Sequence, residues 1–262
     1  MTLRAILISR DEPFFTPEYV LPIFESPDVE IVRMYVDRRP SPHLSKFEIV
    51  RLCGIVGTIK LAFLKALKGL PGGLSIVGYP GSRSISRAAQ NYKIQVKPID
   101  SADDTFASEV EALAPDVLIS VANSHVMPDR VLNIPGMTAL NSHSSLLPAY
   151  RGILTAFWTL YDGKSASGVT IHKMVGSIDS GDIIAQSEFK ISEGETMFSY
   201  YRKAARLGGG LWLQVLANLN TTNQDSPFLA PARSREDHHQ NVFTKPTPGE
   251  IEKFRAAGKR FL

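Results

Sequence analysis

An asparagine and a histidine lie two residues apart in ALNSHSSLLPAYRG, residues 139–152. On an extended backbone, side chains at positions i and i+2 point to the same side, so Asn141 and His143 can reach one bound molecule. The Asn141 amide can donate to an oxyanion on an attacked carbonyl, and His143 can exchange a proton near neutral pH. The pair suits acyl transfer, although a turn asparagine and a structural histidine are the simpler interpretation of each residue alone.

A carboxylate that can join this pair lies downstream in SIDSGDI, where Asp179 stands between two expected strands. A turn at this position can place a carboxylate at the edge of a sheet. Beside His143, it would favour the imidazolium and orient the ring. A turn stabilised by the Asp side chain itself is the alternative interpretation.

The elements that must position these residues follow the pattern of βαβ units. Short apolar runs predict strands over residues 4–9, 30–36, 75–77, 95–96, 117–120, 168–174 and 182–189. Amphipathic runs predict helices over residues 17–25, 84–92, 103–113, 153–161, 195–219 and 248–257. We therefore expect an α/β, Rossmann-like, mostly parallel sheet flanked by helices. Residues 1–219 would form the catalytic domain, and residues 220–262 a short C-terminal extension.

The most membrane-like stretch is FEIVRLCGIVGTIKLAFLKALKGL, from Phe47 to Leu70. Four basic residues interrupt it, which disfavours a membrane span of about 20 mostly apolar residues. A partly buried helix is the expected structure, and contact with a membrane surface or a partner is the alternative. The sequence does not say what this helix does.

Composition narrows the classes of partner and of compartment. The net charge is +3, from 29 basic and 26 acidic residues, so no broad surface for a polyanion is implied. Cys53 is the only cysteine, which excludes a disulfide framework and a cysteine-cluster metal site, as is typical of a reducing cytosol. The N-terminal apolar run is followed by acidic residues, so it predicts a strand and a cytoplasmic protein. No G-x-G-x-x-G follows that strand, and no G-x-x-x-x-G-K-[ST] occurs.

The runs NSHSSLLPAYRG and SGVTIHKMVGSIDSGDIIAQ closely resemble the formyltransferase family that uses 10-formyltetrahydrofolate. That family includes methionyl-tRNA formyltransferase, glycinamide ribonucleotide formyltransferase and the sugar N-formyltransferases. Upstream, LAPDVLISVANSHVMPDRVLNIPG is similar to the strand and loop that line the family's folate pocket, so the resemblance covers roughly residues 75–205. It implies the formyltransferase fold and places the family's catalytic trio on Asn141, His143 and Asp179.

The resemblance also implies roles for further residues. Backbone groups of two segments would bind the pterin ring of the co-substrate 10-formyltetrahydrofolate: Ser124, His125, Val126 and Met127, and Ile178, Gly181 and Asp182. Arg151 would either contact an acceptor phosphate or anchor its loop. His172 and Lys173 are interpreted as structural or surface residues. No metal is implied.

The acceptor is a primary amine, and its identity is the open question. Methionyl-tRNA formyltransferases add a C-terminal β-barrel domain, for which the residues beyond Asn220 are too few. The tail QNVFTKPTPGEIEKFRAAGKRFL instead resembles the short tails of formyltransferases that occur with sugar-modifying enzymes, so a nucleotide-linked amino sugar or other small amine is expected. A charged tRNA is the alternative within the family. A 10-formyltetrahydrofolate hydrolase is a further alternative, although it would carry an N-terminal regulatory domain that does not fit before Arg4. A non-catalytic folate-binding module also stays open, as does a homodimer.

Overall fold

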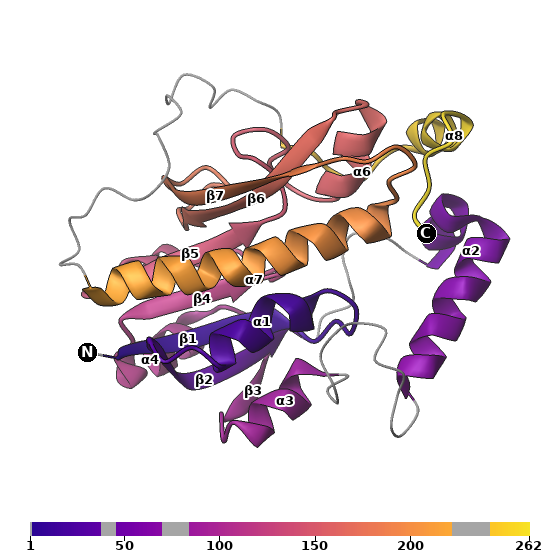
Figure 1. Ribbon diagram of the computed structural model, residues 1–262. Helices are drawn as coiled ribbons and strands as arrows, with labels where there is room; N and C mark the ends of the chain where they lie inside the picture. The colour runs from indigo at the N-terminus through magenta and orange to yellow at the C-terminus, as the bar shows by residue number, and fades with distance from the viewer. Residues whose placement is uncertain (1, 38–45, 70–83, 222–241) are drawn as a thin grey trace.

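The computed structural model describes residues 2–37, 46–69, 84–221 and 242–262. Within these residues a seven-stranded sheet has the order β3-β2-β1-β4-β5-β6-β7 (Figure 1). The strands are β1 (Leu3–Arg10), β2 (Val29–Asp37), β3 (Val96–Ile99), β4 (Val117–Val121), β5 (Thr138–His143), β6 (Ala166–Lys173) and β7 (Ile183–Lys190). Strands β1 to β5 pair in parallel, and β6 and β7 are antiparallel. The predicted mostly parallel sheet is confirmed, while the strand expected at 75–77 lies outside the described residues.

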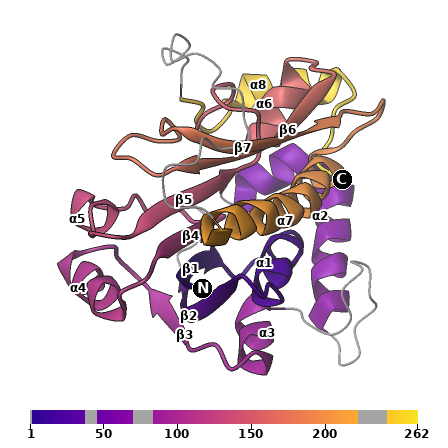
Figure 2. The same cartoon turned by 60° about the vertical axis from the view of Figure 1, so that its left-hand side comes forward.

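Helices cover both faces of the sheet (Figures 1 and 2). One face packs against α1, α3 and α7, and the other against α4 and α5. The helices are α1 (Thr16–Phe24), α2 (Lys46–Gly69), α3 (Ile85–Asn91), α4 (Asp104–Leu113), α5 (Asp129–Leu132), α6 (Thr155–Tyr161), α7 (Met197–Thr221) and α8 (Pro248–Ala256). The result is a three-layered α/β fold.

The central strands are apolar on both sides, as burial between two helical layers requires. In β1, Ala5 and Leu7 belong to the cluster under α1 and α7, whereas Ile6 and Ile8 belong to the cluster under α4. The pairing of β1 with both β2 and β4 leaves it no exposed edge. Alternation of side chains along an apolar strand therefore builds two cores at once.

A third apolar cluster joins α6, α8 and part of α2. The rings of Phe157 and Phe254 stack with centroids 4.6 Å apart. Helix α8 begins after Thr247, whose side chain and that of Glu250 form a reciprocal capping box, as the expected closing helix requires. The C-terminus consequently lies beside α2 and α8, on the side toward which the parallel strands point (Figure 1).

Helix α2 is the helix expected within 47–70, and it has a break in its path. Gly54 has φ 70° and ψ 172°, a conformation essentially restricted to glycine. Leu52 is 2% exposed and belongs to the third cluster, whereas Val56 is 80% exposed. Helix α2 is thus partly buried, and no helix among the described residues has the length and apolarity to span a bilayer.

Candidate active site

Strand β5 carries Asn141 and His143 to the carboxyl end of the parallel strands, where the sheet changes to antiparallel pairing. Its neighbour β4 runs parallel to it, and β6 runs antiparallel, with Asn141 opposite His172. The residues of β5 change from apolar to polar along this strand, in the order TALNSH. The apolar part of the strand therefore packs in the core, and its polar end lies beyond the core.

His143 is held by both ring nitrogens. Nε2 lies 2.8 Å from the carbonyl oxygen of Tyr150, and because a carbonyl only accepts, Nε2 carries a proton. Nδ1 lies 3.3 Å from Oδ2 of Asp179. The buried ring thus has an acceptor at each nitrogen, which fixes its orientation.

Asp179 lies in the β6–β7 turn with φ 48°, a left-handed conformation that Asp tolerates. Its Oδ2 also accepts the backbone N–H of Gly152 at 2.9 Å. Burial of the carboxyl opposes ionisation, but the rings of His143 and His172 and the Gly152 N–H outweigh it and hold the pKa of Asp179 well below its ordinary value. Asp179 is therefore a carboxylate that is fixed between two histidines.

His172 lines the same cavity, so of the two interpretations, structural or surface residue, its burial contradicts the second. It is 3% exposed, and its Nε2 lies 3.1 Å from Nδ2 of Asn141 and 3.5 Å from Oδ1 of Asp179. Its Nδ1 lies 2.9 Å from the carbonyl oxygen of Lys173 and so carries a proton. The ring of His172 therefore connects the Asn141 amide to the Asp179 carboxylate.

The loop after β4 is fixed by a buried ion pair. Asp37, at the end of β2, lies 3.1 Å from Nη2 of Arg10 and 3.4 Å from Nε2 of His125. Arg10 also donates to Oγ of Ser124 at 2.7 Å, and the Ser124 hydroxyl donates to Asp37. These contacts join the ends of β1, β2 and β4, so the loop has a defined backbone shape.

A cavity of about 720 Å³ contains the catalytic residues predicted from the sequence. Asn141, His143 and Asp179 all line it, together with His172. Of the residues expected to bind the folate, the structure places these five in its wall: Ser124, His125, Val126, Met127 and Ile178. The trio and most of the expected folate residues thus share one cavity.

Gly181 and Asp182, which were also expected to bind the folate, do not line this cavity. A Cβ on Gly181 would lie 1.9 Å from the carbonyl oxygen of Lys173. The carbonyl oxygen of Asp182 accepts the N–H of Lys173 at 2.9 Å. Both residues bring the turn close to β6, and through it they place Asp179.

Arg151 is buried and is also not among the lining residues. Its Nε donates to the carbonyl oxygen of Ile178 at 3.0 Å, and its Nη2 donates to the same oxygen. Of the two roles expected for Arg151, these contacts correspond to the second, because they anchor the segment 151–153 to the turn that carries Asp179.

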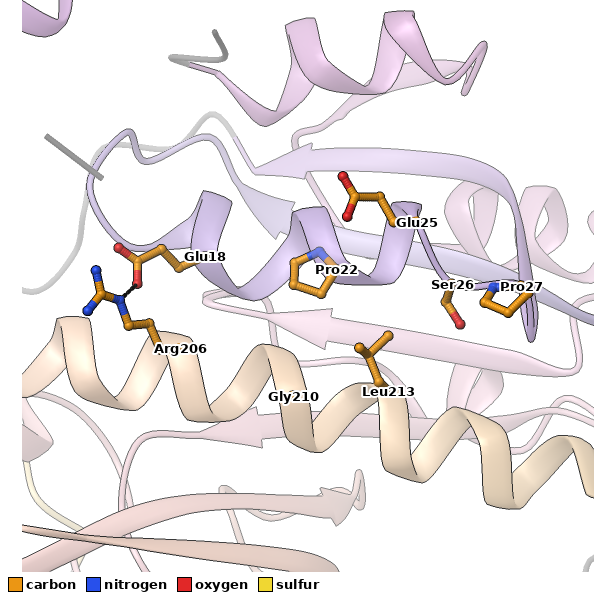
Figure 3. A pocket seen from close by; sticks show the side chains of 8 residues that line it. All are labelled: Glu18, Pro22, Glu25, Ser26, Pro27, Arg206, Gly210 and Leu213. Atoms are coloured by element: carbon orange, nitrogen blue, oxygen red, sulfur yellow. Dashed lines mark hydrogen bonds and ion pairs between the residues drawn. The ribbon is translucent and has the colours of Figure 1, made fainter. Parts of the chain in front are cut away.

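A second cavity, of about 710 Å³, lies between α1 and α7 (Figure 3). Glu18 is one of its lining residues, and its carboxylate pairs with Nε of Arg206 at 2.7 Å and with Nε of Arg202 at 3.4 Å. This cavity shares no lining residue with the first. Because the trio lies in the first cavity, the first is the candidate active site. In the described part of the chain, no group of three or more His, Cys, Asp or Glu is arranged to hold a metal ion.

The family model described as formyl transferase matches residues 79–216, more than half of the chain and the whole of the trio. The chain belongs to the formyl transferase family. Curated relatives include methionyl-tRNA formyltransferases from Koribacter versatilis and Syntrophus aciditrophicus. The first is 30% identical over 60% of this chain and 56% of the relative, and the second is 34% identical over 57% and 46%. This formyl transferase family chain therefore spans about half the length of these curated relatives.

Solved structures show that the fold is the family's fold. Phosphoribosylglycinamide formyltransferase from Bacillus halodurans matches 86% of this chain and 100% of its own, with a TM-score of 0.59 and 17% identity. The enzyme of that description from Streptococcus pneumoniae has the same TM-score, with 16% identity. The expected formyltransferase fold is confirmed. Enzymes of the family use 10-formyltetrahydrofolate as formyl donor, as the sequence motifs imply.

Sequence reasoning missed two groups of residues in the cavity wall. His172 was missed because its signal is a register, opposite Asn141 across β5 and β6, and not a spacing along the chain. No motif marks individual residues of the C-terminal segment or of α2, whose role the sequence left open between an acceptor pocket, a dimer contact and a surface patch. Their lining residues are Ile49, Leu52, Cys53, Leu61, Val242, Phe243, Thr244 and Phe261.

Proposed function

We propose that this chain transfers the formyl group of 10-formyltetrahydrofolate to a primary amine. The observation that carries the proposal is the convergence of Asn141, His143 and Asp179 in one cavity, with Nδ1 of His143 3.3 Å from Oδ2 of Asp179. Amide, imidazolium and carboxylate are the groups that acyl transfer to an amine requires.

In the proposed reaction, the lone pair of a neutral amine attacks the formyl carbon and the carbonyl oxygen becomes an oxyanion. Asn141 donates to that oxyanion, and the charge of His143 stabilises it. Asp179 holds the imidazolium and accepts the proton that the attacking nitrogen loses, directly or through water. The bond from carbon to N10 of the folate then breaks, and the proton taken from the attacking nitrogen passes to N10 as it leaves. The formyl amide and tetrahydrofolate leave.

The folate is proposed to bind along the loop of residues 124–127 and beside Ile178. The buried Arg10–Asp37 pair supports this assignment, because it fixes the backbone of the loop before any ligand arrives. Gly181 and Asp182 are proposed to contribute by shaping the turn. The division at residue 219, the cytoplasmic location and a homodimer stay predictions from the sequence.

A nucleotide-linked amino sugar is the acceptor that we propose first, from the resemblance of the C-terminal tail to those of formyltransferases that occur with sugar-modifying enzymes. A charged tRNA is the second candidate, because the curated relatives carry the name methionyl-tRNA formyltransferase. The net charge of +3 is modest for a polyanion ligand, but it does not distinguish the two candidates.

Single-turnover transfer from 10-formyltetrahydrofolate tests the proposal, with amino-sugar nucleotides, simple amines and charged initiator tRNA as acceptors. Asn141→Ala should slow transfer by about 10²- to 10³-fold, the usual effect of losing one oxyanion donor. His143→Ala should also slow transfer. Asn133→Ala removes an exposed amide outside the cavity and is the matched control.

Three results would replace the proposed reaction. Formate release that no amine accelerates would identify a hydrolase. Folate binding with no loss of the formyl group would identify a binding module. Full activity in Asn141→Ala and His143→Ala would show that the trio is not the catalytic centre.

A further inference from the structure

The cavity extends beyond the residues that carry the proposed chemistry. Part of its lining is apolar or aromatic and comes from the start of α1, from α2, from α7 and from the C-terminal segment. We name this set the apolar wall: Phe15, Ile49, Leu52, Cys53, Leu61, Tyr201, Val242, Phe243 and Phe261. It is separate from the loop 124–127 that is proposed for the folate.

Three segments contribute residues to this part of the lining: the loop before α1, helix α2 and the C-terminal segment. Among their described residues, Glu12 is the one charged residue in the lining. Its carboxylate accepts the backbone N–H groups of Phe14, Phe15 and Thr16 at 2.7, 2.7 and 3.4 Å. A helix start is a common site for a phosphate because its N–H groups are unpaired. At α1 a side-chain carboxylate already takes this position, and its charge would repel a second anion.

The apolar wall is attached to the catalytic residues. The N–H of Phe243 donates to the carbonyl oxygen of Arg151 at 2.7 Å, and the N–H of Ile153 donates to that of Phe243 at 3.0 Å. Between them lies Gly152, whose N–H binds Asp179. A Cβ on Gly152 would lie 2.2 Å from the carbonyl oxygen of Phe243, so the two segments are in direct contact.

Helix α2 is held in place by the same C-terminal segment. Arg255 donates to the carbonyl oxygen of Arg51 at 3.3 Å, and Arg51 pairs with Glu252 at 3.6 Å. Leu52 packs in the cluster of α6 and α8. The apolar wall is therefore a built surface of the cavity that continues from the reacting groups.

We propose that the apolar wall binds the carbon skeleton of the acceptor beside its attacking nitrogen. The acceptor is then a primary amine with apolar carbon surface beside the nitrogen, and any phosphate that it carries, as in a nucleotide-linked amino sugar, lies outside this wall. The inference rests on the proposed function and narrows its acceptor. An apolar skeleton gains affinity here by leaving water, whereas a phosphate against the apolar wall would lose its hydration, because no side chain of the named wall is a cation.

Two amines of similar size test the proposal, hexylamine and 2-aminoethyl phosphate, as acceptors of the formyl group. The wild-type protein should prefer hexylamine in kcat/KM by about 10-fold or more, the discrimination that hydrophobic pockets reach. Leu61→Arg places a cation in the wall and should remove or invert that preference. Ile59→Arg places the same cation on a 64% exposed position of the same helix, outside the cavity lining, and should leave the preference unchanged.

Cys53 supplies a second readout that does not depend on turnover, because it is the only cysteine and lies in the wall. Burial raises the pKa of its thiol to about 11, so alkylation is followed at alkaline pH. Hexylamine should slow the alkylation of Cys53 more than 2-aminoethyl phosphate does.

The two readouts separate the inference from the function on which it rests. Protection of Cys53 by hexylamine without any formyl transfer would support the apolar wall and overturn the transferase. Transfer that favours 2-aminoethyl phosphate, or equal protection by both amines, would overturn the apolar wall and leave the transferase intact.

Discussion

His172 connects the two groups that the proposed reaction needs most, the amide of Asn141 and the carboxylate of Asp179. Its ring is oriented by the carbonyl oxygen of Lys173, so Nε2 faces both partners. A side chain in this position fixes the direction of the Asn141 amide. We therefore regard His172 as a positioning residue.

Replacement of His172 should lower kcat and leave folate affinity unchanged. His172→Ala frees the Asn141 amide, and a small misplacement of a catalytic group costs up to about 10²-fold in rate. His172→Gln should restore part of the rate, because its side-chain oxygen can accept the same hydrogen bond. Single-turnover rates and pH–rate profiles of both variants provide the measurement. A wild-type kcat in His172→Ala would contradict the positioning role.

Asp179 should make the stability of the protein depend on pH. Its folded pKa lies below the ordinary value of 3.8, so its ionised form stabilises the fold above that pH. This contribution should be lost as pH falls below about 4, through the folded pKa. The difference in unfolding free energy between wild type and Asp179→Asn, measured by urea titration, should therefore shrink between about pH 5 and pH 3. A constant difference would contradict this prediction.

At the scale of elements, α1 and α7 lie side by side (Figure 3), and α7 carries three consecutive glycines, Gly208 to Gly210, in this stretch. A Cβ on Gly208 would lie 1.8 Å from Cε1 of Tyr19, and one on Gly209 would lie 2.5 Å from the carbonyl oxygen of Glu18. A Cβ on Gly210 would meet nothing within 4 Å. The first two glycines permit the close approach, and the third does not contribute to it.

Alanine substitutions at Gly208 and at Gly210 should therefore change the free energy of unfolding in opposite directions. Gly208→Ala should destabilise the fold by about 1–3 kcal/mol through overpacking against a buried ring. Gly210→Ala should stabilise it by about 0.5–1 kcal/mol, because alanine loses less backbone entropy in a helix. Thermal and urea unfolding of the two variants measure this contrast. Destabilisation of equal size in both would show that helix packing does not distinguish them.

At the scale of the whole molecule, the C-terminal segment links the third apolar cluster to the cavity. Phe254 packs on Phe157 of α6, and neighbouring residues of α8 hold Arg51 of α2. The apolar wall depends on both contacts. Damage to α8 should consequently affect acceptor binding from outside the cavity.

Phe254→Ala should destabilise the protein by about 3–5 kcal/mol, the usual effect of deleting a buried aromatic ring. Where the variant still folds, KM for the acceptor should rise more than the dissociation constant of the folate. Phe63→Ala removes a ring that is 61% exposed on α2 and should change stability by less than about 0.5 kcal/mol. Equal increases in both constants would contradict the assignment of α8 to the acceptor side.

The positions of most strands along the chain were accessible from sequence, because they have a local signal, and the trio, which stays a prediction, came from the resemblance of its motifs to the family. Continuous apolar runs such as AILIS, residues 5–9, predict strands that are buried on both faces. The motif around Asn141 and His143 and the turn at Asp179 carry residue types that acyl transfer requires. Local chemistry of this kind does not depend on knowing which elements are neighbours.

The remainder of the site depends on contacts between distant segments, which leave no local signal. His172 reaches Asn141 across 31 residues because β5 and β6 pair in one antiparallel register. Arg151 turns to Ile178, and Phe243 pairs beside Gly152, because packing of the turn and of the tail brings them there. An apolar residue in α2 has the same pattern whether it faces core, cavity or solvent. Packing between distant segments determines which of these environments each residue has. The residues that line the cavity are therefore decided by the tertiary structure.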